Sequence, residues 1–496
     1  MRVVETPQTQ LGDLPIADIQ FDIKSRDDIP QLLRGLQYIY VNDALRTAVF
    51  TLLDNHIQAD ESHANGRPGM SLWNILVMGV LRLDLNWDYD RLHEQVNNHK
   101  TIRQMLGHAD FFDTHSYHLQ TLKDNVHLLT PELLGEINQV VVTAGHAVVK
   151  KKESEVLRGR CDSFVVKTDV HYPTDINVLN DAVRKVIILT ARLCEAHGLS
   201  TWRQHAYNVR HVKKRMRTAQ LKKRGGGQTE AQKARRQTQV VEAHQQYVDV
   251  VQGYLDKARL SLHTLNEMGV LSLIERISET EIQQYLRDAD RQIDQIRRRV
   301  MQGETIPHTE KVFSIFEPHT EWIVKGKAGI SQELGLRVCI MEDRHRFLLH
   351  HQVMEKQTDD QVAVSMVNET KARFPDFSTC SFDKGFHSPA NQTRLRDILD
   401  VVALPRKGKR SQKVEALESS KDLQQAHDKH SAVASAINAL GVHGLDRCPD
   451  HGLVGFKRYV ALSMVARNLQ CLGAILADQE KKRLERQRRR QQKQAA

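Results

Sequence analysis

Two aspartates in short strand-like runs are the residues of this chain most able to do chemistry. Asp162 lies inside the run 160–166, and Asp383 directly follows the run 379–382. Burying a carboxylate in an apolar strand is costly unless a cation meets it there. A divalent metal ion is one such cation, and a pair of carboxylates on neighbouring strands would suit metal-assisted cleavage or transfer of a phosphodiester. Ordinary salt bridges at two strand edges are the alternative.

The charge of the chain indicates a polyanionic partner. The formal net charge of the 496 residues is +10, and the basic residues are grouped in three places. Such groups fit nucleic acid, because neutralising phosphates provides most non-specific affinity, although each group could also be a solvated surface. The candidate DNA-binding residues are Lys213, Lys214, Arg215, Arg217, Lys222, Lys223, Arg224, Arg406, Lys407, Lys409, Arg410, Arg488, Arg489 and Arg490.

Cysteine usage and hydropathy exclude several other classes. The six cysteines are scattered and form no C-x2-C pair, which argues against a zinc ribbon and favours a reducing compartment. We find no uninterrupted apolar run of membrane length and no apolar signal segment near Met1. The sequence therefore predicts a soluble protein of the cytoplasm, without a membrane partner.

The N-terminal 150 residues read as a series of helices. Ser71 is a candidate N-cap before an apolar periodic run, and Thr130 followed by Pro131 has the pattern of an N-cap and first helical residue. Short helices in series could form a helix-turn-helix-like reader of DNA ends, or a plain packed core. We treat residues 1–150 as a helical domain and a candidate for binding DNA ends.

The remainder alternates between strands and helices around a long charged insertion. Leucines and isoleucines from Leu255 to Ile296 keep a helical period, which predicts a hairpin or coiled coil that packs within one chain or between chains. The order of the other elements predicts an α/β fold with a mixed sheet flanked by helices. The predicted divisions are a first core part at 151–198, the basic helical insertion at 199–305, a second core part at 306–478 and a basic tail at 479–496.

Several motifs resemble those of one family of mobile-element enzymes. The run 383–388, Asp-Lys-Gly-Phe-His-Ser, resembles the second-aspartate motif of DDE insertion-sequence transposases, and Asp162 with Ser163 resembles the first. The runs 168–175 and 438–450 are similar to the ISNCY type in particular. The resemblance covers nearly the whole chain, and its ordered set of motifs is far more specific than Asp-Lys-Gly alone.

The resemblance implies a fold, a cofactor and partners. It implies an RNase H-like catalytic core in which Asp162 lies on the first strand and Asp383 at the end of an adjacent one. Two Mg²⁺ or Mn²⁺ ions would bind these carboxylates and activate the entering and leaving oxygens. The partners would be double-stranded DNA, as terminal repeats and target, and further copies of the chain in a homo-oligomer. The location would be the bacterial cytoplasm, in association with the nucleoid.

The third carboxylate of the resemblance is absent. A glutamate is expected a few residues before Ile437 and Asn438, where this chain has Ala434, which cannot bind a metal. On a helix, His430, Ala434 and Asn438 share one side. Possible neighbours of the metals are Lys384, His387, His430 and Asn438. Lys167 also stands where a glutamate is expected, and a lysine there would compete with metal for Asp162.

Three functions follow from these residues. The first is a transposase that binds terminal repeats and catalyses Mg-dependent strand cleavage and transfer, with activity impaired by Ala434. The second is a catalytically inactive DNA-binding protein that represses or inhibits related elements. The third is an RNase H-like nuclease outside transposition, which the helical insertion and basic tail disfavour.

Overall fold

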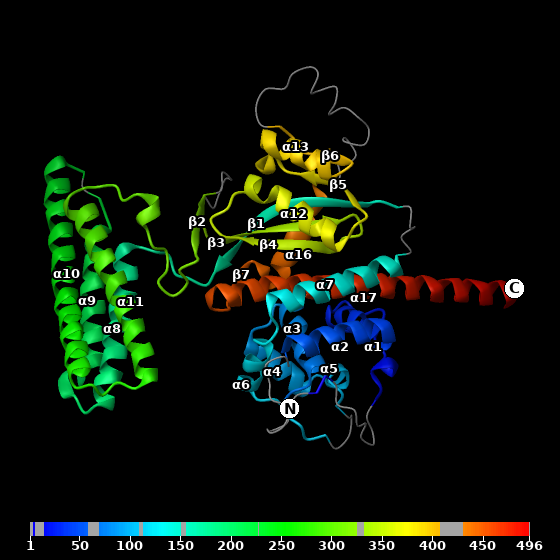
Figure 1. Ribbon diagram of the computed structural model, residues 1–496, viewed down its shortest axis with the longest axis horizontal. Coiled ribbons are helices and arrows are strands. Elements are labelled where there is room, and N and C mark those ends of the chain that lie inside the picture. The colour runs from blue at the N-terminus through cyan, green and yellow to red at the C-terminus, as the bar shows by residue number, and fades with distance from the viewer. Residues whose placement is uncertain are drawn as a thin grey trace. The chain divides into compact units, whose positions relative to one another are not determined.

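The chain folds into two compact units. The first comprises residues 1–169 and 323–496, and the second comprises residues 170–322. Figure 1 shows the computed structural model. It describes residues 3–4, 14–57, 69–108, 113–149, 155–226, 228–324, 332–406 and 430–495.

A mixed β-sheet forms the centre of the first unit. Strand β1 (Leu157–Thr168) pairs antiparallel with β3 (Gln332–Asp343), which pairs antiparallel with β4 (Leu348–Met354). On its other side β1 pairs parallel with β5 (Phe377–Phe382), and β5 pairs parallel with β6 (Val401–Ala403). Two short strands complete the sheet, β2 (Glu321–Val324) beside β3 and β7 (Arg447–Cys448) beside β1. The mixed α/β architecture predicted from the sequence is confirmed.

Helices connect the parallel strands, because such strands need a crossover. Helix α12 (Asp359–Arg373) links β4 to β5. The turn η5 (Lys384–Phe386) and helix α13 (Pro389–Ile398) link β5 to β6. Helix α16 (Ala432–Leu440) and the turn η6 (Gly441–Leu445) precede β7, and α16 packs against β1.

The N-terminal region is helical, as predicted. Its predicted caps are confirmed: the Ser71 side chain accepts the amide of Asn74, and the Thr130 side chain accepts the amide of Leu133. In α3 every residue except Asn74 is buried, so α3 forms core and cannot present a DNA-reading surface. The elements are η1 (Ile16–Asp18), α1 (Ile29–Val41), α2 (Asp43–Ile57), α3 (Leu72–Asp84), α4 (Tyr89–Asn98), α5 (Lys100–Met105), α6 (Leu119–Val126) and α7 (Pro131–Val148).

The long C-terminal helix joins the N-terminal helices to the sheet. Helix α17 (Gly452–Ala495) packs against α1, α3, α7 and β4. Where α1 and α17 cross, a Cβ on Gly473 would lie 1.8 Å from the Gln31 carbonyl oxygen, and one on Gly35 would lie 2.2 Å from that of Leu469. Glycine therefore lets the two backbones approach closely. One hydrophobic core spans the N-terminal helices and the sheet, so residues 1–150 are not a separate domain.

Helix α17 differs from two expectations. Residues 479–495, predicted as a separate tail, continue the helix and project from the body of the first unit (Figure 1). An 18-residue window of α17 is also apolar and long enough to cross a membrane, with a mean hydropathy of 1.5. However, 67% of that window is buried inside the protein, as in the core helix of a soluble protein.

The second unit consists of packed helices. They are α8 (Asp175–Ala196), η2 (Ser200–Trp202), α9 (His205–Lys223), α10 (Glu230–Glu267), α11 (Leu273–Ile296), η3 (Arg297–Met301) and η4 (His308–Glu310). Leu255, Leu262 and Ile293 are buried within this unit of a single chain, whereas Ile274 and Ile277 are exposed. Helix α8 shares the same core, so the helical insertion begins near residue 170 rather than at 199.

Candidate functional site

The sheet places the two predicted aspartates side by side. In the parallel pairing of β1 with β5, Cys161 is opposite Phe382, so Asp162 and Asp383 follow as the next residue on each strand. Neighbouring strands lie about 4.8 Å apart, which brings the two carboxylates within reach of a common metal site. Asp162 is half-buried, and Asp383 is exposed at the N-terminus of η5, where it accepts the Lys384 amide at 2.6 Å. The two side chains can therefore act together.

Position 434 belongs to the same side of the sheet. Arg160 is opposite Ser381 in the pairing, and alternation along each strand puts Asp162 and Asp383 on the side that these two residues share. The Ser381 hydroxyl lies 3.1 Å from Nδ1 of His430. Ala434 comes four residues after His430, which precedes α16, and is exposed at the start of that helix, as is Asn438 one turn later. Ala434 and Asn438 thus share an exposed side of α16, whereas Val433 and Leu440 are buried on the other.

A third aspartate, missed in the sequence, ties the two motifs together from the opposite side of the sheet. The Ser163 hydroxyl donates a hydrogen bond of 2.7 Å to Asp359 Oδ1, at the start of α12. A Cβ on Gly385 would lie 2.7 Å from Oδ2 of the same carboxylate. Glycine in the Asp-Lys-Gly motif thus lets η5 pack against Asp359. Through Asp359, Ser163 is therefore held in a fixed position relative to η5.

A buried ion pair occupies the aspartate side of the sheet next to Asp162. Arg160 donates to Glu342 on β3 at 3.0 Å; the Glu342 side chain is buried, and the Arg160 side chain is 12% exposed. Burial raises the pKa of Glu342 to about 7, although the Arg160 guanidinium opposes the shift. The positive charge of Arg160 is therefore directed to Glu342.

Lys167 lies away from Asp162, contrary to the prediction. Its ammonium group binds both carboxylate oxygens of Asp446 at 3.0 Å. Five residues of strand separate it from Asp162, a distance of about 16 Å along β1. Lys167 is thus a partner of Asp446 and does not compete with metal for Asp162.

The other candidate neighbours of the metals lie near the motif in different environments. Lys384 is exposed directly after Asp383. His387 is half-buried, with Nε2 3.3 Å from the Gln392 side-chain oxygen, which also accepts the Arg406 side chain at 2.9 Å. His387 and the exposed Arg406 thus converge on one glutamine of α13.

The conspicuous run 438–450 has a structural role. Asp450 pairs with Arg82 of α3 at 2.7 Å, and both side chains are at most 5% exposed. The Arg82 guanidinium also lies 4.0 Å from the centre of the Tyr89 ring. Breaking a buried pair of this kind typically costs about 3–5 kcal/mol. The run therefore anchors the end of the sheet to the N-terminal helices.

The basic residues predicted to contact DNA are at the surface wherever the structure describes them. Helix α9 of the second unit buries Asn208, Val212, Met216 and Ala219, so its seven lysines and arginines lie on the remaining surface. No acidic residue occurs in this helix. Lys213, Lys214, Arg217, Lys222, Lys223 and Arg224 are exposed, and Arg215 is half-buried, donating to Gln246 at 3.2 Å.

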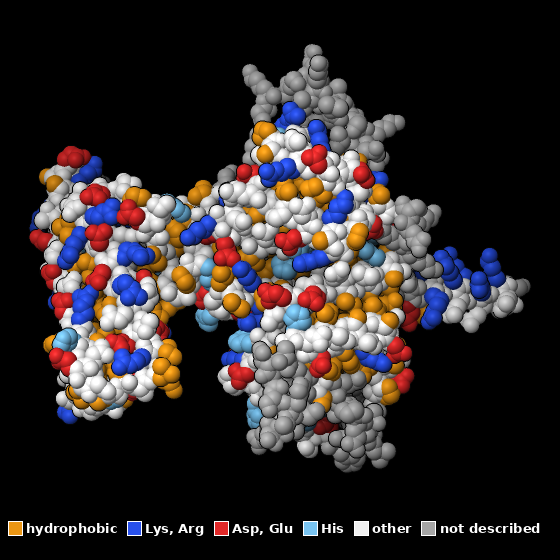
Figure 2. All heavy atoms as spheres, viewed as in Figure 1, with side chains coloured by type: hydrophobic (Ala, Val, Ile, Leu, Met, Phe, Trp, Pro, Cys, Tyr) orange, Lys and Arg blue, Asp and Glu red, His pale blue; other side chains and the backbone are white. Residues whose placement is uncertain are grey.

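The remaining basic groups differ in how much of them is described. Arg488, Arg489 and Arg490 are exposed on the projecting end of α17, where Figure 2 shows Lys and Arg side chains along the helix. Lys407, Lys409 and Arg410 lie outside the described residues. The outer surface of α4, a candidate DNA reader, carries Asp90 and Glu94 as well as Arg91, so it is not basic.

The side chains at positions 162, 383 and 434 suit a hard divalent cation only in part. Two adjacent carboxylates are ligands that Mg²⁺ prefers, whereas alanine at position 434 supplies none. Within the described ranges, no group of three or more His, Cys, Asp or Glu side chains is placed to hold a metal ion. Comparison of the chain with models of protein families, with curated proteins and with solved structures finds no match.

Proposed function

We propose that the protein is a DNA transposase of the DDE type with an RNase H-like core, and that Ala434 impairs its catalytic step. The observation that carries the proposal is the pairing of β1 with β5, which sets Asp162 beside Asp383 on one side of the sheet. Helix α16, on which a third carboxylate is expected, packs against β1. These three elements are the parts that the sequence resemblance requires.

The two aspartates would hold Mg²⁺ or Mn²⁺, which supplies charge neutralisation at the transferring phosphate and activates the attacking oxygen. The chain itself fixes the carboxylates on rigid strands, and Asp359 braces the Asp383 turn through Ser163 and Gly385. The exposed basic surface of α9 and the end of α17 would bind the DNA backbone. The partners in this proposal are terminal repeats, target DNA and a second copy of the chain, in the cytoplasm.

A second function is favoured by one specific observation. The exposed side chain at position 434 is a methyl group, so the carboxylate set lacks its third member while the basic surfaces remain. A chain of this kind binds DNA without cutting it and inhibits related elements by occupying their ends. DNA binding should then persist where cleavage is lost.

The test is the variant Ala434→Glu, assayed for cleavage of a duplex carrying the element's terminal repeat with Mg²⁺ or Mn²⁺. We expect cleavage to rise by more than about 100-fold over the present chain, because loss of a direct metal ligand exceeds the 10–100-fold cost of losing a supporting residue. Duplex affinity should change little. Asp162→Asn in the same background should abolish the gain.

The matched control is Ser435→Glu, which adds the same side chain at the next exposed position of α16. Successive helical residues differ in direction by about 100°, so this glutamate points away from position 434. Equal cleavage by the present chain and by Ala434→Glu would show that another residue completes the set. Equal gains in the two glutamate variants would show that added charge, rather than ligation, is responsible.

A further inference from the structure

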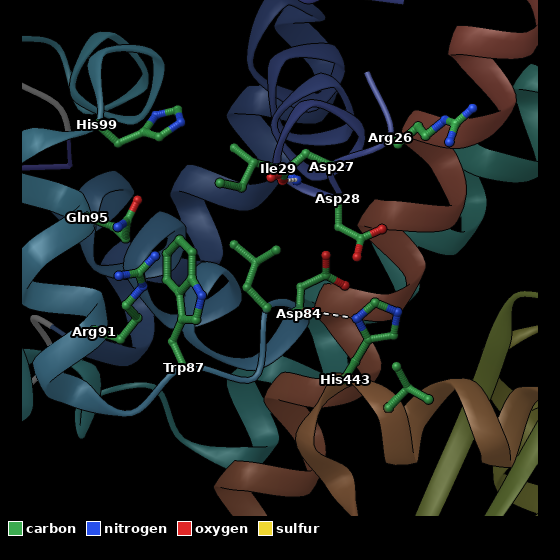
Figure 3. A pocket seen from close by; sticks show the side chains of 12 residues that line it. Arg26, Asp27, Asp28, Ile29, Asp84, Trp87, Arg91, Gln95, His99 and His443 are labelled. Atoms are coloured by element: carbon green, nitrogen blue, oxygen red, sulfur yellow. Dashed lines mark hydrogen bonds between the residues drawn. The ribbon is translucent and has the colours of Figure 1, made fainter. Parts of the chain in front are cut away.

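A pocket of about 500 Å³ lies in the first unit, among residues that the proposed catalytic site does not use (Figure 3). The segment before α1 forms one wall, and the end of α3 with the loop after it forms another. Helix α4 and the turn η6 complete the pocket. A volume of this size is typical of sites for small ligands.

The pocket contains a buried carboxyl group without a protein partner. Asp84, the last residue of α3, is 1% exposed, and neither of its side-chain oxygens has a hydrogen-bond partner among the described residues. Burial raises the pKa of Asp84 well above its usual value, Asp28 raises it further, and Arg467 opposes the shift. Asp28, by contrast, accepts the Gln470 side chain at 3.2 Å. Leaving such an acceptor unpaired is costly, which indicates a place for a ligand that donates hydrogen bonds.

The orientation of the Asp84 carboxyl group supports a ligand site. Figure 3 shows the carboxyl of Asp84 directed toward that of Asp28 and near the ring of His443. The His443 ring is held in place by a hydrogen bond to the backbone oxygen of Asp84. This end of the pocket therefore presents hydrogen-bond acceptors.

The other end of the pocket carries cationic and donor groups, whereas Arg26 is the cation on the side of Asp28 and Asp84. Arg91, Gln95 and His99 come from α4 and the residue that follows it, and they supply cationic and donor groups. The partly buried Trp87 stands between the two ends in Figure 3. An aromatic ring between a cationic end and an acceptor end suits a flat ligand that carries an anion and N–H donors.

We propose that this pocket binds a single nucleotide, with its base against Trp87, its N–H groups at Asp84 and its phosphate at Arg91. Among the common bases, guanine alone presents two adjacent N–H donors on its Watson–Crick edge, which match the two oxygens of Asp84 in its ionised form. Such hydrogen bonds favour the ionised form, so binding of guanine releases the proton that Asp84 holds without a ligand. The pocket is thus selective for guanine. The same chemistry is offered by a free guanine nucleotide and by a guanine turned out of a DNA duplex. Binding of a guanine turned out of a DNA duplex rests on the proposed function, whereas binding of a free nucleotide does not.

The experiment measures binding of guanosine and adenosine 5′-monophosphates, and of three DNA duplexes of equal length. One duplex is fully paired, one carries a single bulged guanine and one a single bulged adenine. If the ligand is a DNA base, the guanine bulge binds at least about 10-fold more tightly than the adenine bulge, because both bases are already unpaired and only guanine offers two N–H groups to Asp84. If the ligand is a free nucleotide, guanosine monophosphate binds and the bulge has no effect.

Two variants test the assigned contacts. Asp84→Asn keeps the shape but replaces one acceptor by a donor, so the guanine preference should disappear. Trp87→Leu should weaken binding by about 5- to 150-fold, the value of one stacking contact. Asp90→Asn, an exposed residue of α4, is the matched control and should bind as the parent does.

The outcomes separate this proposal from the proposed function. Binding of the paired duplex without a guanine preference in either nucleotides or bulges overturns the nucleotide pocket and leaves DNA binding intact. Binding of guanosine monophosphate without any duplex binding overturns the proposed function and supports the pocket. A guanine preference that survives Asp84→Asn also overturns the assignment.

Discussion

At the scale of single residues, the buried Asp84 should penalise the folded state. Its pKa is raised above the unfolded value of 3.8, so the folded protein holds a proton that the unfolded chain releases. Stability from this group is complete below pH 3.8 and is lost as pH rises through the folded pKa. The penalty is therefore present at higher pH.

We predict that Asp84→Asn is more stable than the parent at neutral pH, and that the difference disappears below about pH 4. The amide cannot ionise, and the substitution breaks no hydrogen bond to a described residue. Urea unfolding at several pH values measures the difference. A variant less stable than its parent at pH 7 would show that the carboxylate has a stabilising partner in the protein.

The residues of the candidate site differ in how far the sequence revealed them. Asp162 and Asp383 could be recognised because each is a carboxylate in or beside an apolar strand. Asp359 could not, because its role depends on a contact with Ser163 across nearly two hundred residues. Asp84 left a weak signal: with Arg82 it interrupts an otherwise apolar helix, and buried charge in such a helix points to a specific partner.

At the scale of elements, the crossing of α1 and α17 depends on glycine. We predict that Gly473→Ala destabilises the first unit by more than about 2 kcal/mol, because the new methyl group meets backbone rather than a movable side chain. Scanning calorimetry should show a lower transition temperature. Gly253→Ala is the matched control, since this helical glycine of α10 has open space around its Cβ position. That substitution should stabilise its helix by about 1 kcal/mol. Equal effects of the two substitutions would contradict the close crossing.

Element boundaries were largely predictable, whereas their grouping was not. The helices α3 and α7 begin where the cap residues Ser71 and Thr130 predict, because these signals are local. The assignment of α8 was not predictable, since its apolar positions fit either the sheet or the helical insertion. Only the three-dimensional contacts with α9, α10 and α11 decide this grouping.

At the scale of the whole molecule, two exposed basic surfaces should determine duplex affinity. One is helix α9, and the other is the projecting end of α17. Residues 481–494 contain eight lysines and arginines and one glutamate, all exposed on the projecting helix. The last described ion pair between this end and the body of the first unit joins Glu480 to Arg34. The segment after Glu480 can therefore be removed without disturbing the core.

We predict that a chain ending at Glu480 keeps its transition temperature but shows a weaker salt dependence of duplex binding. Each lost phosphate contact lowers the slope of log affinity against log salt by about 0.9. The comparison is a full-length chain with Lys213, Lys214 and Arg217 changed to glutamine, which alters α9 alone. An unchanged slope in both proteins would leave these surfaces without a role in binding DNA.

The path of α17 also has a consequence for how the protein is made. Helices α1 and α3 leave the ribosome early, but the helix against which they pack is synthesised last. At 5–20 residues per second, roughly 20 to 80 s pass between them. During this interval their apolar sides are open to chaperones and proteases. A message cut short before codon 452 would therefore yield a fragment destined for degradation instead of a partly working protein.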